Sequence, residues 1–251
     1  MFYLGKLDDK ESRRTPPARR APDWPARFSE LADAAHDPRL RAYYAAGLPA
    51  GDTPLAEVPM VALDVETTGL DPVRDGIVSI GMVPMTLERV HASASRHWIV
   101  RPRVRLDETS VTLHGITDSQ VEEAPDLQSI LGEVLEAMAG RIVVVHCRDI
   151  ERQFLDQALK PRIGEGIEFP TIDTMALEAE LHPRRRPGFF ARLFGRREQV
   201  SIRLAASRAR YGLPRYGLHH ALTDALATGE LLQAQIAHRY APDTRLDALW
   251  T

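Results

Sequence analysis

The stretch ALDVETTGLDP, residues 62–72, ends an apolar run that begins at Met60. Asp64 and Glu66 are two positions apart in the predicted strand, so their side chains project from the same face. Two neighbouring carboxylates repel each other unless a cation lies between them or one is protonated. The alternative is an acidic pair on a surface strand, but the buried run before the pair favours the end of a central strand.

The sequence around this stretch predicts a sheet of mixed direction. Three strands follow one another, the second and third joined by a hairpin near Thr86, and helices then alternate with shorter strands. This order is typical of a mixed α/β sheet flanked by helices. Besides 60–65, the predicted strands are 76–83, 91–100, 142–145 and 167–173, and the clearest helices cover 127–138 and the residues from 146 to about 159.

Both ends of the chain differ from this central part. Residues 1–22 are charged and rich in proline, which predicts a disordered tail. Asp23 and Pro25 then predict a helix start, and a second short helix is expected from Pro38 to Gly47. The extension and linker 23–59 are too small for a core of their own, so we expect them to pack on the main domain, 60–240. Residues 241–251 form a C-terminal tail.

Composition limits the classes of function. The 251 residues are 44% hydrophobic and carry a net charge of −3, so any contact with nucleic acid must come from a local patch. The single cysteine, Cys147, fits a reducing compartment. The sequence shows neither a signal peptide nor a segment of the roughly 20 apolar residues that cross a membrane, which predicts a cytoplasmic protein without a transmembrane segment.

The second acidic stretch is HHALTDALATGELL, residues 219–232. Asp224 lies in a predicted amphipathic helix, five residues after His219. On a continuous helix the two would be roughly 140° apart. They can meet only if His219 belongs to the preceding loop, which YGLP at 211–214 favours. The alternative is a helix start with an exposed histidine pair, because His220 competes for any role.

A third stretch, VVVHCRDIERQFL at 143–155, runs from a predicted strand into a helix. Three acids lie within or just beyond it: Asp149, Glu151 and Asp156. Asp149 lies about 200° around the helix from Glu151, so the two do not share a face. We expect Asp149 to be the N-cap of the helix and Asp156 to be solvated.

These stretches and HGIT, 114–117, resemble the DnaQ-like (DEDDh) 3′–5′ exonucleases in order and spacing. This family includes RNase T and the proofreading subunit of the bacterial replicative polymerase, and the resemblance covers residues 60–238. It implies a ribonuclease H-like fold with a mixed five-stranded sheet and two divalent ions, Mg²⁺ or Mn²⁺. In the family pattern Asp64 bridges both ions, Glu66 and Asp224 hold one of them, and His219 is the general base.

The resemblance also implies a fourth carboxylate, five residues after His146, and in this chain that position is Glu151. The family residue is an aspartate, so the side chain here is one methylene longer. We expect Glu151 to serve the second metal ion. Thr67 and His114, in two of the matching motifs, are candidate nucleic-acid contacts.

The segment 184–215 carries ten arginines and one acid, Glu198, and it contains a basic and aromatic insertion at 184–200. The insertion can be an arm for nucleic acid, in which arginines neutralise phosphates and phenylalanines stack on bases. It can also be a membrane-surface helix, a peptide that docks on a sliding clamp, or a solvated loop. The residues expected to contact nucleic acid are Arg184, Arg185, Arg186, Phe189 and Phe190.

The sequence therefore predicts a metal-dependent 3′–5′ exonuclease that releases nucleoside monophosphates from single-stranded 3′ ends. DNA is expected ahead of RNA, although the residue that would read the 2′-hydroxyl is not identifiable. One alternative is a proofreading subunit that contacts a polymerase or its clamp. Another is a nucleic-acid-binding module that lost activity through the change at Glu151.

Overall fold

A computed structural model describes residues 21–104, 116–182, 200–217 and 219–251 of the chain. Its core is one five-stranded sheet with the order β3-β2-β1-β4-β5, which confirms the predicted mixed sheet. β1 pairs antiparallel with β2 and parallel with β4. The strands are β1 (Met60–Thr67), β2 (Ile77–Met85), β3 (Arg96–Ile99), β4 (Ile142–Val145) and β5 (Thr171–Asp173).

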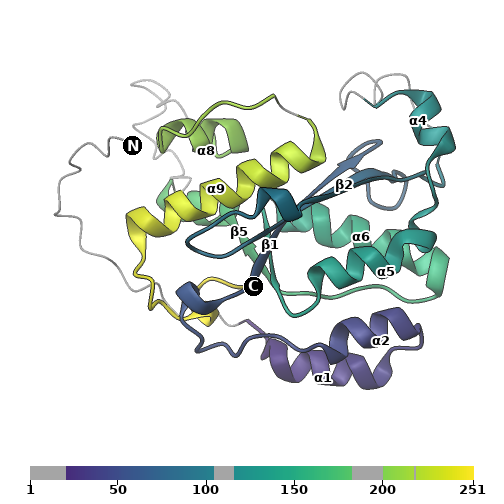
Figure 1. The fold of residues 1–251 in the computed structure, drawn as a ribbon, viewed down its shortest axis with the longest axis horizontal. Helices are drawn as coiled ribbons and strands as arrows, with labels where there is room; N and C mark the ends of the chain where they lie inside the picture. Colours follow the sequence, from purple (N-terminus) through teal and green to yellow (C-terminus); the bar gives the residue numbers. More distant parts are fainter. Residues whose placement is uncertain (1–20, 105–115, 183–199, 218) are drawn as a thin grey trace, which may run out of the picture.

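Helices cover both faces of this sheet (Figure 1). The long helix α9 lies across one face, against β1 and β2, with α8 beside it, whereas α5 and α6 lie on the opposite face. The helices are α1 (Trp24–Ala34), α2 (Pro38–Ala45), α4 (Asp118–Glu123), α5 (Leu127–Met138), α6 (Arg148–Ile163), α7 (Thr174–Leu181), α8 (Leu204–Arg210) and α9 (Ala221–Arg239), with short 3-10 turns η1 (Leu55–Glu57), η2 (Ala92–Ala94) and η4 (Leu246–Ala248).

The N-terminal extension packs on the main domain, as expected for so small a unit. The Asp23 side chain caps α1 by accepting a hydrogen bond from the Ala26 amide, and Pro25 lies in the first turn. Four buried aromatic side chains then join the extension to the hydrophobic core that surrounds the sheet. They are Trp24, Phe28, Tyr43 and Tyr44, and α2 contacts α5 beneath the sheet (Figure 1).

Two glycines allow α9 to lie close to the sheet. Gly81 pairs with Asp64 across β1 and β2, and a Cβ at Gly81 would lie 2.3 Å from the backbone carbon of Ala221. A Cβ at Gly229, two turns along α9, would meet the sulfur of Met85 at 3.0 Å. At Gly81 two backbones approach each other, which only glycine permits, whereas Gly229 faces side chains of β1 and β2. Gly81 therefore sets how near the start of α9 comes to the sheet.

Several predicted element boundaries were wrong. The expected strand 91–100 is shorter, because Ala94 and Ser95 donate to His91 and Ala92 in a local turn and only Arg96–Ile99 joins the sheet. The expected strand 167–173 keeps only Thr171–Asp173, since Pro170 has no amide hydrogen to donate to a sheet.

The N-cap of α6 is Cys147 and not Asp149, because the chain enters the helix directly after His146. Asp149 therefore falls in the first helical turn, where it is exposed and lies 3.7 Å from Arg148. Asp156 is half-buried rather than solvated and pairs with Lys160 at 2.6 Å.

The C-terminal segment packs on the protein. Leu249 and Trp250 are buried, and Thr251 exchanges backbone hydrogen bonds with Thr171 at the edge of β5. Residues 1–20 of the predicted tail and 183–199 of the predicted insertion lie outside the described residues, so both remain predictions. Within the described ranges, no helix has the length and apolar character needed to cross a bilayer.

Candidate active site

Three carboxylates meet where β1 ends and α9 begins. Asp64 and Glu66 project from the same face of β1, as their spacing predicts, and Asp224 faces them from the first turn of α9. One oxygen from each of the three lies within 4.8 Å of the others. A bulge between Glu66 and Thr67 ends the regular pairing of β1 with β2 at this point. Bulges redirect the chain, and the turn that follows leaves the carboxylates at the end of β1, the central strand of the sheet.

His219 lies in the loop before α9, which is the placement that its spacing from Asp224 requires. The helix begins at Ala221, and the His219 amide donates a 3.0 Å hydrogen bond to Asp224 Oδ2. His219 has a φ of 66°, and no other described residue except glycine has a positive φ. Such a conformation is uncommon for a histidine and persists only when its surroundings hold it.

The neighbouring histidine has a different environment. His220 is the N-cap residue of α9, and its ring lies 4.7 Å from the ring of His97 on β3, at an angle of 35°. His97 in turn shares a 2.7 Å hydrogen bond with the hydroxyl of Ser79. His220 therefore packs toward β3, whereas the His219 backbone is bonded to Asp224.

Glu151 is buried in the first turn of α6, with only 3% of its surface exposed. Its Oε2 has no hydrogen-bond partner among the described residues. Burial raises the pKa of Glu151 well above its ordinary value, and the nearby carboxylates of Asp173 and Asp149 raise it further. Glu151 is not one of the three grouped carboxylates, but it is near enough to raise the pKa of Asp64.

The electrostatics of the site show carboxylates with too little positive charge around them. Burial is the main cause that raises the pKa of Asp64, and Glu151, Glu66 and Asp224 add to it by repulsion. Burial also raises the pKa of Asp224, although the His219 amide opposes the shift. Asp224 Oδ1 is buried without a partner in the described part of the chain. Such a donor set favours a hard divalent cation, because a cation removes both the repulsion and the unsatisfied oxygens.

The other predicted contact residues divide into two groups. The Thr67 hydroxyl donates a 2.6 Å hydrogen bond to the carbonyl of Gly69 and so braces the turn after the acidic pair. The rest lie outside the described residues, so their proposed contacts with nucleic acid stay predictions: His114, Arg184, Arg185, Arg186, Phe189 and Phe190.

Two residues that support the site, Ser79 on β2 and His97 on β3, were not predicted from the sequence. Ser79 is fully buried and pairs with Glu66 across the strands. Burial lowers the pKa of His97, and His220 lowers it further. A glycine inside a strand often marks a close approach of another backbone, so Gly81 could have predicted that another element packs against β2 at this point. No local pattern predicted the contact between His97 and His220, because it joins positions 123 residues apart.

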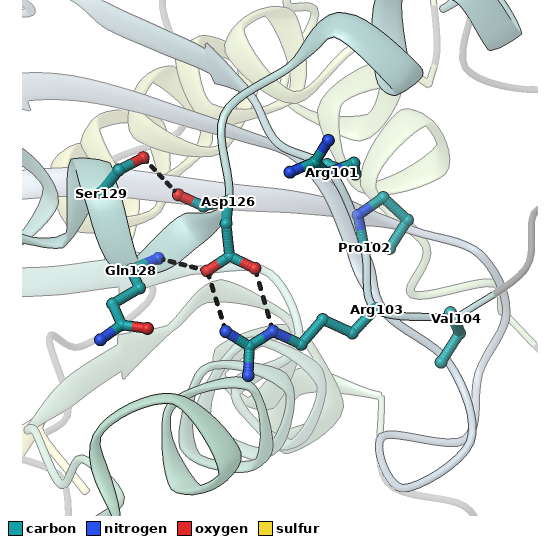
Figure 2. A pocket seen from close by; sticks show the side chains of 7 residues that line it. All are labelled: Arg101, Pro102, Arg103, Val104, Asp126, Gln128 and Ser129. Atoms are coloured by element: carbon teal, nitrogen blue, oxygen red, sulfur yellow. Dashed lines mark hydrogen bonds and ion pairs between the residues drawn. The ribbon is translucent and has the colours of Figure 1, made fainter.

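A shallow recess of about 820 Å³ lies elsewhere, between the segment after β3 and the start of α5 (Figure 2). Arg103 and Arg162 both bond Asp126, the N-cap of α5. Burial alone would raise the pKa of Asp126, but these bonds and the Gln128 amide lower it. The recess contains none of the site carboxylates, and Arg103 faces Asp126 rather than open space (Figure 2), so we assign it no ligand.

Proteins already described resemble this chain in sequence and in fold. The RNase_T model, described as exonuclease, matches residues 61–232. DNA polymerase III PolC-type of Thermotoga maritima is 29% identical over 180 residues, covering 72% of this chain and 12% of that protein. DNA polymerase III subunit epsilon-like protein of Rhodobacter capsulatus is 29% identical over 71% of this chain and 24% of its own length. The chain thus spans a minor part of both relatives.

Among solved structures, the fold resembles the nuclease domain of 3′hExo, described as a DEDDh family member bound to rAMP. The two share 16% sequence identity with a TM-score of 0.57, over 72% of this chain and 92% of that domain. At this identity the likeness concerns the fold alone, and it agrees with the mixed sheet and flanking helices described above.

Proposed function

The chain belongs to the RNase_T exonuclease family, and from this premise we propose that it is a 3′–5′ exonuclease acting on single-stranded ends. It would hydrolyse the terminal phosphodiester bond and release a nucleoside monophosphate. One observation carries the proposal: three carboxylates from β1 and α9 converge within 4.8 Å, next to the loop that carries His219. Family membership supports a nuclease hydrolase, and the direction of cleavage and the single-stranded substrate are our inference.

We propose two divalent ions, Mg²⁺ or Mn²⁺, as cofactors. The buried, unpartnered oxygens of Glu151 and Asp224 and the raised pKa values of the site fit such a charge. Asp64, Glu66 and Asp224 would hold one ion, and Asp64 with Glu151 would serve the other. When bound, two such ions stabilise the attacking and leaving oxygens of a phosphoryl displacement.

His219 is the proposed general base. A neutral imidazole can accept a proton near pH 7, and this residue lies at the exposed edge of the site. Its backbone bond to Asp224 holds the loop beside the carboxylates. The imidazole would take the proton of the attacking water, while the carboxylates keep their charge for the cations.

The substrate and partners are part of the proposal. We expect DNA ahead of RNA, because the two polymerase III relatives are named as DNA polymerase proteins, whereas the 3′hExo structure holds rAMP. The same relatives support a second candidate, a proofreading subunit bound to a polymerase or its clamp. A contact through 184–200 and the cytoplasmic location remain predictions.

The test is digestion of matched DNA and RNA oligonucleotides, labelled at the 5′ end, with Mg²⁺ or Mn²⁺. We expect a ladder of shortened labelled products and free mononucleotides, both abolished by a chelator. Immediate release of labelled mononucleotide would indicate the opposite direction. Binding without any cleavage in either metal would favour the inactive binding module.

The adjacent histidines offer a matched pair for the general base. We expect His219→Ala to lower kcat by at least about a hundredfold, because a positioned base contributes on that order. His220→Ala should keep most of the activity, since His220 packs toward His97. The opposite ranking of kcat in the same oligonucleotide assay would overturn the assignment.

A further inference from the structure

The described residues of the loop that carries His219 form no helix or strand. It leaves α8 after Arg210 and reaches α9 at Ala221. A general base must lie within hydrogen-bond reach of the proton that it takes, so a loose loop would weaken catalysis. The positive φ of His219 also needs an external hold, because the conformation is unfavourable by itself.

Arg208, on α8, is buried where the loop and α9 meet. Its side chain is only 5% exposed. One guanidinium nitrogen donates to the carbonyl of Ala227 at 2.6 Å, and another donates to the carbonyl of Pro214 at 2.9 Å. The Arg208 carbonyl accepts the Leu213 amide at 3.1 Å. Arg208 therefore bonds the loop at two adjacent residues, Leu213 and Pro214, and links it to the helix that holds Asp224.

A second contact extends this link toward His219. Glu230 of α9 accepts a 2.8 Å bond from Arg208 on one carboxylate oxygen and a 2.9 Å bond from the Tyr216 hydroxyl on the other. The guanidinium also lies over the Tyr216 ring, 4.7 Å from its centre. Tyr216 is three residues before His219, so this contact fixes the last part of the described loop before the proposed base.

These contacts suit an arginine for physical reasons. A guanidinium stays charged at all accessible pH values, so its burial is favourable only when most of its donors are bonded. Its flat, forked shape can reach two backbone carbonyls and a carboxylate at once while stacking on a ring. A lysine could not make this set of contacts, and a loop bonded in this way has little freedom to move relative to α9.

We propose that Arg208, Tyr216 and Glu230 form a clamp that positions His219 against the carboxylates. The clamp residues are positioning residues, and none of them is a ligand or base in the proposed site. The inference rests on the proposed function, because it gives the clamp its purpose. It predicts that loosening the loop lowers turnover and leaves cation binding unchanged, since Asp64, Glu66 and Asp224 are held by β1 and α9 themselves.

Tyr216→Phe tests the clamp with the smallest change, and Tyr211→Phe is its matched control. Both tyrosines donate a 2.9 Å hydrogen bond to a glutamate, but the Tyr211 hydroxyl bonds Glu178 of α7, whereas the Tyr216 hydroxyl bonds Glu230 of α9. The ring of Tyr211 also lies 5.1 Å from the ring of His238 on α9, and phenylalanine would keep that contact. We expect Tyr216→Phe to lower kcat about tenfold, with KM within twofold, because small displacements of a catalytic group have large effects on rate. Tyr211→Phe should keep the kcat of the parent.

Two further readouts separate positioning from general damage. Hydrogen exchange followed by mass spectrometry should show faster exchange over 212–220 in Tyr216→Phe than in Tyr211→Phe. Calorimetric titration with Mn²⁺ should give the same Kd for both variants and the parent. A fully active Tyr216→Phe variant, or an equal loss of kcat in both variants, would overturn the clamp. Failure of the proposed function would instead show in the parent protein, which would then cleave no oligonucleotide.

Discussion

Glu151 and Glu178 are both glutamates on helices, and both are buried, with 3% and 0% of their surfaces exposed. Their surroundings differ. Glu178 accepts hydrogen bonds from Arg210, Tyr211 and Gln235. Burial alone would raise the pKa of Glu178, but these donors outweigh it and lower the pKa. Glu151 has an unpartnered oxygen and a raised pKa.

The difference shows what each region needs from outside the chain. A buried charge is costly unless it is paired and hydrogen-bonded. The network around Glu178 meets this requirement with side chains of α7, α8 and α9, so it serves to join helices. Among the described residues, the carboxylates of Glu151, Asp64 and Asp224 have too few donors and positive charges to offset their burial. A cation would supply the positive charge that these carboxylates lack.

The largest expected effect is in the carboxylate site, at Asp64. Asp64→Ala should lower turnover by at least three orders of magnitude, about 4 kcal/mol of barrier, because Asp64 would hold both ions. The same change removes one of several mutually repelling carboxylates, so the metal-free protein should unfold at the same or higher urea concentration. Near-normal turnover in the folded variant would rule out this site.

The next effect is a pH dependence of folding stability, caused by His146, whose ring nitrogens are both hydrogen-bonded. This histidine bonds Thr174 and the carbonyl of Ile202, and burial lowers its pKa to about 4. Its unfolded pKa is 6.5, so the unfolded chain binds the proton first as the pH falls. The resulting stability is complete above about pH 6.5 and is lost toward pH 4, by about 3 kcal/mol in total.

Urea unfolding of the parent and His146→Gln at pH 7 and pH 4.5 measures this loss. Carboxylates also titrate in this range, and the raised pKa values of Asp64 and Glu151 act in the opposite direction, so the difference between the two proteins isolates the histidine. We expect the parent to lose more stability than the variant. Equal losses would mean that His146 is not buried in its neutral form.

A smaller effect is expected at Glu178 itself. Glu178→Gln keeps the size of the side chain but leaves Arg210 without its ion pair, which should destabilise the fold by about 2 kcal/mol. The released arginine is partly exposed, with 28% of its side chain accessible, and this limits the loss. Urea unfolding measures the change, and cleavage by the folded variant should match that of the parent. An unchanged unfolding midpoint would remove the contrast between the two glutamates.

The sequence predicted the carboxylate site better than the hydrogen-bonded network around Glu178. Asp64 and Glu66 share a face because strand side chains alternate, and His219 had to lie in a loop because helix geometry excluded it from α9. Both inferences depend on residues close together in the chain. The pairs between Glu178 and Arg210 and between Arg208 and Glu230 span 32 and 22 residues, and no local pattern marks them.

Element boundaries show the same limit. The capping box of Thr117 and Gln120 was predictable, because both partners lie in one turn. The N-cap of α6 was not, because the residue type that favours capping is Asp149, whereas the exit of the chain from β4 makes Cys147 the N-cap.

The smallest effect, and the most direct test of the contrast, is at Glu151. Glu151→Gln keeps the size of the side chain and removes its charge. In the metal-free protein at pH 7 this should stabilise the fold by about 1 kcal/mol, since an unpartnered buried carboxylate is lost. The sign is opposite to that expected for Glu178→Gln, although the chemical change is the same.

Activity should respond in the other direction, because the charge that destabilises the empty site is the charge that would hold the second ion. We expect Glu151→Gln to lower turnover about tenfold, a barrier increase of about 1.4 kcal/mol. Glu151→Asp, which restores the residue of the family pattern, should retain or raise activity, and the gain should be larger in Mg²⁺ than in Mn²⁺ because Mg²⁺ tolerates distorted coordination poorly. Unfolding without metal and turnover in both metals, measured on the same preparations, separate the two effects. If Glu151→Gln cleaves as well as the parent, the buried charge has no cation to bind, and Glu151 is a destabilising group without a function in this site.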